Sequence, residues 1–185
     1  MRLPIVTESF LPDSLRLPAG PREGARSGGA HLARASRAQI LGVGHRPLAE
    51  ELSRRAPANL RLAGLLEGEA LADVYAASDV FLHPASTETF GQVIQEAMAS
   101  GLPVVGVRAG GAGWLVKEGR TGMLAEAPGD GLGAVLDRMV RRSDLEVMGR
   151  AARRAVAGRS WAATFDALLD DYAAMAGGWD RRIAA

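Results

Sequence analysis

Short apolar runs alternate with helical segments over most of this chain, and this alternation restricts the fold more than any other feature. Turn residues bound each run, and the run at 103–107 is apolar throughout. A continuous apolar run is typical of a strand that is buried on both faces of a sheet. Strands that alternate with helices predict a parallel sheet covered on both sides. The sequence therefore predicts the α/β class, as a Rossmann-like parallel sheet flanked by helices.

The predicted elements follow one another in a regular order. Strands are expected at 5–7, 40–44, 60–64, 79–84, 103–107 and 122–125. Helices are expected at 47–55, 69–77, 91–100, 111–117, 129–141, 143–157 and 161–176. Ligands of such sheets bind beside the carboxyl ends of the strands. The segment 84–91, which follows a predicted strand directly, is therefore the first place to look for a site.

The segment 14–37 differs from the rest of the chain in composition. It combines prolines and glycines with several arginines, and it sustains neither strand nor helix periodicity before Gly29. Such a composition predicts a poorly packed linker. We therefore divide the chain into a poorly ordered N-terminal remnant and linker, 1–38, and a Rossmann-like domain, 39–185, that is incomplete at its start.

Composition excludes several kinds of site and partner. The 185 residues include no cysteine, which excludes a disulfide scaffold, a zinc–thiolate site and a thiol nucleophile. The formal net charge of +1 gives no bulk electrostatic argument for binding nucleic acid or a membrane. No apolar run is long enough for a transmembrane helix, and the N-terminus lacks the pattern of a secretion signal. A cytoplasmic protein is expected.

The segment from Glu88 to Glu96 carries the strongest chemical signal. A loop carboxylate precedes a predicted helix that starts near Gly91, and the first backbone N–H groups of a helix have no intrahelical partner. Such a helix start can bind a diphosphate, and glycine lets a ligand approach the backbone. A second carboxylate further along the helix suits the two vicinal hydroxyls of a ribose. On spacing alone, however, a helix cap and a solvated glutamate are the more frequent interpretation.

The residues around this pair make a specific match. Residues 84–91 read P-A-S-T-E-T-F-G, residues 96–105 read E-A-M-A-S-G-L-P-V-V, and residues 71–82 read L-A-D-V-Y-A-A-S-D-V-F-L. Downstream, Gly110-Gly111 and Thr121-Gly122 complete the pattern. From about Gly64 to Tyr172 the chain resembles the C-terminal, donor-binding domain of retaining glycosyltransferases of the GT-B fold, in particular family four with its Glu-x7-Glu motif. The amino-acid sequence of 88–96 is most similar to that of GDP-mannose-dependent α-mannosyltransferases.

The resemblance implies a role for each matched residue. Glu88 would contact the transferred sugar and is the implied catalytic residue, whereas Glu96 would bind the ribose hydroxyls of the nucleotide. The backbone amides of Phe90 and Gly91 would contact the sugar, and those of Gln92 and Val93 the diphosphate. The implied donor-binding residues are Glu88, Thr89, Phe90, Gly91, Gln92, Val93 and Glu96.

The resemblance also implies a reaction. A hexose such as mannose would pass from a GDP- or UDP-linked donor to an acceptor hydroxyl with retention of configuration. No metal or other cofactor is expected, because helix dipoles and basic side chains stabilise the leaving diphosphate in GT-B enzymes. The acceptor, a lipid or a saccharide, stays open, and so does association with a membrane surface or a partner domain.

The chain departs from the family in three ways. We find no counterpart of the family's phosphate-binding arginine and lysine, and no lysine precedes Lys117. Residues 1–13 resemble the first strand of the family's other, acceptor-binding domain, whose remainder has no counterpart, and this predicts a truncated chain. Ala85 replaces the family's serine. The alternative function is therefore a non-catalytic nucleotide-binding remnant, or a subunit that requires a partner domain.

His83 ends a predicted strand beside this segment. It could bind a donor phosphate, but an ordinary strand-end residue is the more frequent interpretation.

Overall fold

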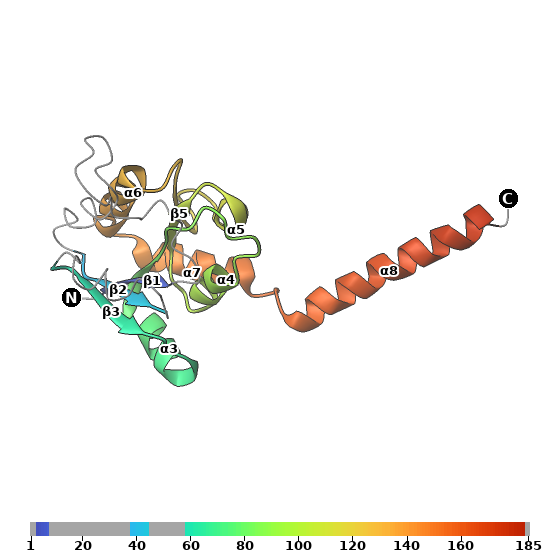
Figure 1. Cartoon of the computed structure of the whole chain (residues 1–185), viewed down its shortest axis with the longest axis horizontal. Helices are drawn as coiled ribbons and strands as arrows, with labels where there is room; N and C mark the ends of the chain where they lie inside the picture. Colours follow the sequence, from blue (N-terminus) through green and yellow to red (C-terminus); the bar gives the residue numbers. More distant parts are fainter. Residues whose placement is uncertain (1–2, 8–37, 45–57, 184–185) are drawn as a thin grey trace, which may run out of the picture.

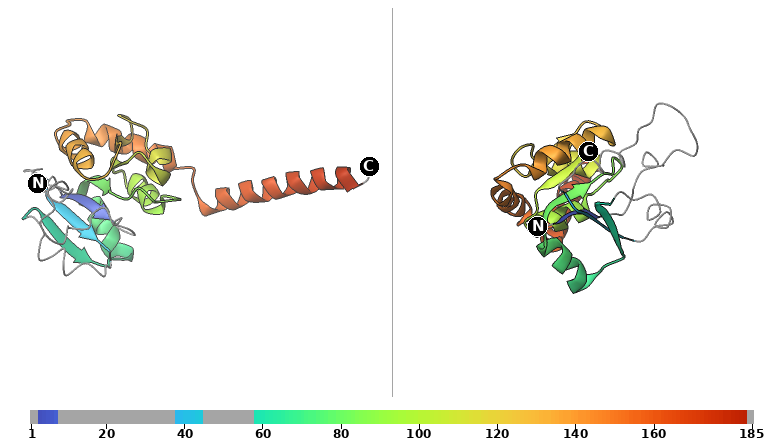
Figure 2. Two further views of the ribbon diagram at one scale, coloured as in Figure 1. Left: turned by 45° about the horizontal axis from the view of Figure 1, so that its top comes forward. Right: turned by 90° about the vertical axis from the view of Figure 1, so that its left-hand side faces the viewer.

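The computed structural model describes residues 3–7, 38–44 and 58–183, and a parallel sheet of six strands lies at their centre (Figures 1 and 2). The strands are β1 (Leu3–Thr7), β2 (Ile40–Val43), β3 (Leu60–Gly64), β4 (Ser78–His83), β5 (Val104–Val107) and β6 (Gly122–Ala125). They are ordered β3-β2-β1-β4-β5-β6, and every neighbouring pair is parallel. This is the strand order of a doubly wound Rossmann fold. The predicted fold class is confirmed.

The described helices lie close to their predicted positions. They are α3 (Gly68–Ala76), α4 (Gln92–Ala99), α5 (Gly110–Leu115), α6 (Asp130–Val140), α7 (Leu145–Val156) and α8 (Trp161–Ile183). The last helix is longer than the predicted 161–176, because the helical backbone continues to Ile183. The helix predicted at 47–55 lies outside the described residues.

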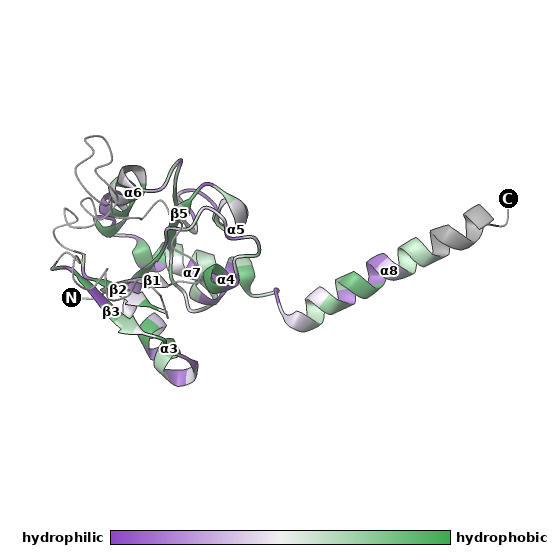
Figure 3. Ribbon diagram, in the orientation of Figure 1, coloured by the Kyte–Doolittle hydropathy of each residue, from purple (hydrophilic) through white to green (hydrophobic). Residues whose placement is uncertain are grey.

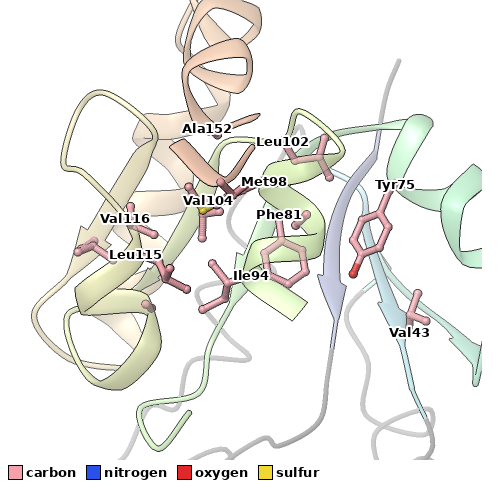
Figure 4. Close-up of a cluster of buried hydrophobic side chains, with 14 residues drawn as sticks. Val43, Tyr75, Phe81, Ile94, Met98, Leu102, Val104, Leu115, Val116 and Ala152 are labelled. Carbon is pink, nitrogen blue, oxygen red and sulfur yellow. The ribbon is translucent and has the colours of Figure 1, made fainter. Parts of the chain in front are cut away.

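Helices cover both faces of the sheet, and each face has its own apolar core. Successive side chains of a strand point to opposite faces. Thus Phe81 of β4 packs with Ile94 and Met98 of α4 on one face, where Tyr75 and Ala152 join them (Figure 4). On the other face, residues of β4 and β5 pack against α6; these include Val80, Leu82, Val105, Leu136 and Met139. Burying one large apolar side chain contributes about 1.5–3 kcal/mol, so both cores hold the sheet and its helices together.

The strand β1 lies inside the sheet, between β2 and β4. Ile5 pairs with Leu41 of β2 on one side and with Phe81 of β4 on the other. Five of the residues that the sequence analysis assigned to a remnant and linker therefore contribute a strand to the Rossmann-like sheet. Residues 8–37 lie outside the described residues, so the domain boundary at residue 38 stays a prediction.

The helix α8 extends away from the rest of the described molecule (Figure 1). Apolar and polar residues alternate along it (Figure 3). Its large apolar side chains are exposed; they are Trp161, Phe165, Leu168, Leu169, Tyr172 and Met175. Apolar side chains at this helical spacing are typical of a packing surface, and no described part of the chain covers them. Among the described residues no helix is both long enough and apolar enough to cross a membrane.

Candidate functional site

The segment 84–91 leads from the carboxyl end of β4 to the start of α4, as the sequence predicted. Gly91 is the residue that caps α4, and its φ of 72° places it in the left-handed region. Residues with a Cβ rarely adopt this conformation. A Cβ at this position would also come within 2.6 Å of the Leu115 side chain of α5. Glycine therefore permits both the sharp turn into α4 and the close approach of α5.

The carboxylate of Glu88 turns back onto its own loop. Its Oε1 atom accepts hydrogen bonds from the backbone N–H of Gly91 at 2.9 Å and of Phe90 at 3.2 Å. A negative charge at this place also complements the positive end of the α4 dipole. The structure therefore shows Glu88 closing the turn that leads into α4, whereas Gly91 is the N-cap of the helix. The two amides that the resemblance assigned to the sugar donate here to Glu88.

The start of α5 lies directly against this loop. The backbone N–H of Gly111 donates to the carbonyl oxygen of Glu88 at 2.7 Å. A Cβ on Gly110 would overlap that same carbonyl oxygen, and a Cβ on Gly111 would lie 2.9 Å from the nitrogen of Gly91. The two glycines thus let α5 fix the backbone position of Glu88.

Glu96 is the fifth residue of α4, about 6 Å along the helix axis from Gln92. The side-chain amide of Gln92 donates a hydrogen bond of 3.2 Å to Oε1 of Glu96. The two side chains therefore lie on the same face of α4, one turn apart. The backbone N–H groups of Gln92 and Val93 belong to the first turn of α4 and have no acceptor within the helix.

These groups surround a hollow of about 480 Å³. Its lining residues are Thr87, Glu88, Thr89, Phe90, Gln92, Val93 and Glu96. Six of the seven predicted site residues line it, and the seventh, Gly91, lies in the turn between them. Thr87 also lines the hollow and was not predicted as a site residue, although its position next to Glu88 in the sequence could have indicated it. No lysine or arginine is among the lining residues that the structure describes.

A second hollow, of about 620 Å³, adjoins the first one at Phe90, Gln92 and Glu96. The start of α8 lines it, together with Trp114 of α5. The guanidinium of Arg159 also lines it and lies 5.1 Å from the centre of the Trp114 ring. This distance is within the range of a cation–π interaction. Arg159 thus contributes a positive charge to the lining of the second hollow, which Glu96 also lines.

His83 ends β4 and is 2% exposed. Its ring stacks on that of Phe81, with the ring centres 6.2 Å apart. Neither ring nitrogen has a hydrogen-bond partner among the described residues. A buried polar group without a partner costs about 1–3 kcal/mol. Burial lowers the pKa of His83 below its ordinary value, and the negative charge of Glu88 partly opposes this shift. These unpaired nitrogens could not be predicted from the sequence.

In the described part of the chain, no group of three or more histidine, aspartate or glutamate side chains could hold a metal ion. The expectation that the reaction needs no metal stays a prediction.

The chain matches the family model for glycosyl transferases group 1 over residues 29–143. A GDP-mannose-dependent alpha-mannosyltransferase of Mycolicibacterium smegmatis is 45% identical over 116 residues, which are 62% of this chain and 30% of that protein. A sulfoquinovosyl transferase of Arabidopsis thaliana is 37% identical over an alignment of 155 positions that covers 78% of this chain and 30% of that protein. The chain thus spans about a third of the length of the curated relatives that it matches.

Solved glycosyltransferase structures share the fold. Sucrose-phosphate synthase from Thermosynechococcus elongatus superposes with a TM-score of 0.72 at 22% identity, over 96% of this chain and 46% of that chain. Anabaena HepE, solved with UDP and glucose, gives a TM-score of 0.68 at 21% identity, over 94% of this chain and 48% of that chain. The resemblance to GT-B glycosyltransferases is confirmed. Because the family model matches more than half of its residues, the chain belongs to the glycosyl transferases group 1 family.

Proposed function

We propose that this chain is the donor-binding part of a glycosyltransferase. It would hold a nucleoside-diphosphate sugar in the hollow at the carboxyl edge of the sheet, and transfer the hexose to an acceptor hydroxyl with retention of configuration. The observation that carries the proposal is the arrangement of Glu88, the start of α4 and Glu96 around one hollow. The loop carboxylate would bind the sugar, and the backbone N–H groups at the start of the helix would bind the diphosphate. The carboxylate on the helix would bind the ribose.

The diphosphate would lie on the N–H groups of Gln92 and Val93, where the α4 dipole favours negative charge. These groups also stabilise the charge that grows on the diphosphate as its bond to the sugar breaks. Glu96 would turn from Gln92 to accept hydrogen bonds from the two ribose hydroxyls. Glu88 already uses Oε1 for the loop amides, so Oε2 is the oxygen that would first meet a sugar hydroxyl.

GDP-mannose is the first donor to test. Curated relatives at 39% to 45% identity carry the name GDP-mannose-dependent alpha-mannosyltransferase. UDP-linked sugars are the second choice, since a structural neighbour was solved with UDP and glucose. The identity of the acceptor stays open between a lipid and a saccharide.

Calorimetric titration with GDP-mannose, GDP and UDP tests the proposal. A hydrogen bond to a charged group is worth about 1.5–3 kcal/mol, so Glu96→Ala should weaken nucleotide binding roughly 10- to 100-fold. Glu146→Ala is the matched control, because Glu146 is an exposed glutamate on α7 whose ion pair is with Arg150. The proposal fails if none of the three nucleotides binds the wild-type chain, or if Glu96→Ala binds as the wild type does.

A second candidate is a binding subunit that acts together with a partner domain. The exposed apolar stripe of α8 favours it, and so does the absence of lysine and arginine from the described lining of the first hollow. The first half of α8 carries Asp166, Asp170 and Asp171, and Arg181 and Arg182 follow near its end. The acidic first half, where the apolar stripe lies, suits a protein partner better than an anionic membrane. Transfer or hydrolysis of the donor by the purified chain alone would count against this candidate.

A further inference from the structure

Two groups at the site have hydrogen-bonding states that binding of a donor in the hollow does not by itself explain. The ring nitrogens of His83 are buried without a partner among the described residues. The amides of Phe90 and Gly91, which point toward the loop, are already bound to Oε1 of Glu88. One rearrangement accounts for both states.

His83 directly precedes the loop that carries Glu88, since it is the last residue of β4. His83 points to the same face of the sheet as Phe81, because the two are two residues apart in a strand and their rings stack. On the neighbouring strand β5 it pairs with Gly106, which has no side chain to occupy that face. The polar ring thus lies at the edge of an apolar core.

Glu88 is the charged group that acts on this ring. The carboxylate favours the protonated imidazole, whereas burial lowers the pKa of His83 more strongly, so the ring is neutral at pH 7. A neutral imidazole carries one N–H donor, and a carboxylate is its strongest acceptor. The helices α3, α4, α5 and α7 all pack on this face. Their charged residues are Glu69, Asp73, Glu96, Glu146, Arg150, Arg153 and Arg154. Among the described charged groups, Glu88 is the one whose charge shifts the pKa of His83.

We propose that His83 is a positioning residue that provides an alternative hydrogen-bond donor for the Glu88 carboxylate. Without ligand, Glu88 binds the amides of Phe90 and Gly91. When the hexose of the donor arrives, Glu88 accepts from the imidazole N–H of His83, and the two amides become free for sugar hydroxyls. The number of unpaired buried groups falls in this exchange, since the imidazole donor gains a partner and the amides keep one. This inference rests on the proposed function, because the sugar drives the exchange.

Binding measurements at pH 7.5 separate this role from a structural one. His83→Leu should weaken GDP-mannose binding about 10-fold, and GDP binding by less than 2-fold, because GDP has no hexose to drive the exchange. His83→Gln, which keeps an N–H donor, should recover most of the affinity for GDP-mannose. A general packing defect would instead weaken both ligands equally, and this result would overturn the inference.

A double-mutant cycle tests the partner. In a Glu88→Ala background, His83→Leu should change GDP-mannose binding by less than 2-fold, because the acceptor is already gone. An equal 10-fold loss in both backgrounds would show that His83 does not act through Glu88 and would overturn the inference. If the wild type binds GDP-mannose and His83→Leu binds it equally well, the inference falls and the proposed function stands. If the wild type binds no nucleotide, the proposed function itself falls, and the inference with it.

Nitrogen-15 NMR of the wild-type chain gives a test that needs no stable variant. The chain has three histidines, so imidazole N–H signals are few. GDP-mannose should move one buried imidazole N–H signal downfield by more than 1 ppm and slow its exchange with water, while GDP leaves it in place. An imidazole spectrum that is the same with both saturating ligands would overturn the inference.

Discussion

Glu88 and His83 lie five positions apart, yet their polar atoms are in opposite situations. The carboxylate of Glu88 has two backbone donors within hydrogen-bond distance. The imidazole of His83 has none among the described residues and is almost fully buried. At the scale of single residues, the difference follows from the backbone conformation, which is a turn at Glu88 and an extended strand at His83. The loop curls toward Glu88, whereas the straight strand holds His83 against Phe81.

Burial of His83 predicts that acid weakens the fold. The pKa of His83 is lowered in the folded chain and returns to about 6.5 on unfolding, so the unfolded chain binds more protons below this pH. The contribution of His83 to the free energy of unfolding should therefore be at its maximum above pH 6.5. Below this pH the free energy of unfolding should fall, by at most about 1.4 kcal/mol per pH unit. Urea denaturation at pH 7.5 and 5.5 measures this loss.

His83→Leu is the comparison that isolates the effect, because it leaves the other two histidines in place. The variant should lose less stability than the wild type between the two pH values. Equal losses in the two proteins would show that His83 titrates normally in the folded chain. The sequence could predict the position of His83 at a strand end. It could not predict the pairing of its nitrogens, since this depends on groups that are brought close only by the fold.

At the scale of elements, the sheet shows what local patterns determine and what they leave open. Apolar runs such as 103–107, bounded by glycine and proline, predicted β5 and its neighbours closely. The flanks of the Glu88–Glu96 pair predicted the loop and helix that line the hollow. The place of β1 in the sheet was not predicted. Pairing with β2 and β4 joins residues that are more than 30 positions apart, and the short run at 5–7 does not specify a partner.

The inner position of β1 predicts that its backbone hydrogen bonds are needed for folding. Proline removes a backbone N–H and is excluded from the middle of a sheet. Val6, which pairs with Gly42 and Leu82, is the position to change. Val6→Pro should lower the free energy of unfolding by about 3 kcal/mol or more. Thermal unfolding followed by circular dichroism measures the effect, with Val6→Ala as the control that keeps the N–H. Equal melting temperatures for the two variants would mean that β1 is dispensable, as expected of an unpaired remnant.

At the scale of the whole molecule, α8 is the part that the Rossmann-like body does not explain. The helical spacing of its apolar residues is typical of a helix with one apolar face, but this spacing does not indicate what packs against that face. In the structure the stripe is exposed, and the rings of Trp161 and Phe165 lie 6.1 Å apart upon it. By helical spacing, Asp166 and Asp170 lie on the opposite face. Figure 3 shows that hydrophilic and hydrophobic residues follow one another along the described part of this helix.

An exposed apolar stripe of this length predicts self-association or partner binding, because large contiguous apolar patches are rare on monomers. The chain should therefore form concentration-dependent oligomers in sedimentation velocity experiments. Replacing Phe165, Leu169 and Tyr172 together by serine should shift it to the monomer. The melting temperature should change little, since the three side chains are 56%, 63% and 57% exposed and pack against little else.

Replacing Asp166 and Asp170 by serine is the matched control and should leave association unchanged. A wild-type chain that stays monomeric at all concentrations, or a serine variant that associates as strongly as the wild type, would show that the stripe does not drive self-association. In the serine variant, nucleotide binding at Glu96 should persist, because Glu96 and the stripe lie on different helices.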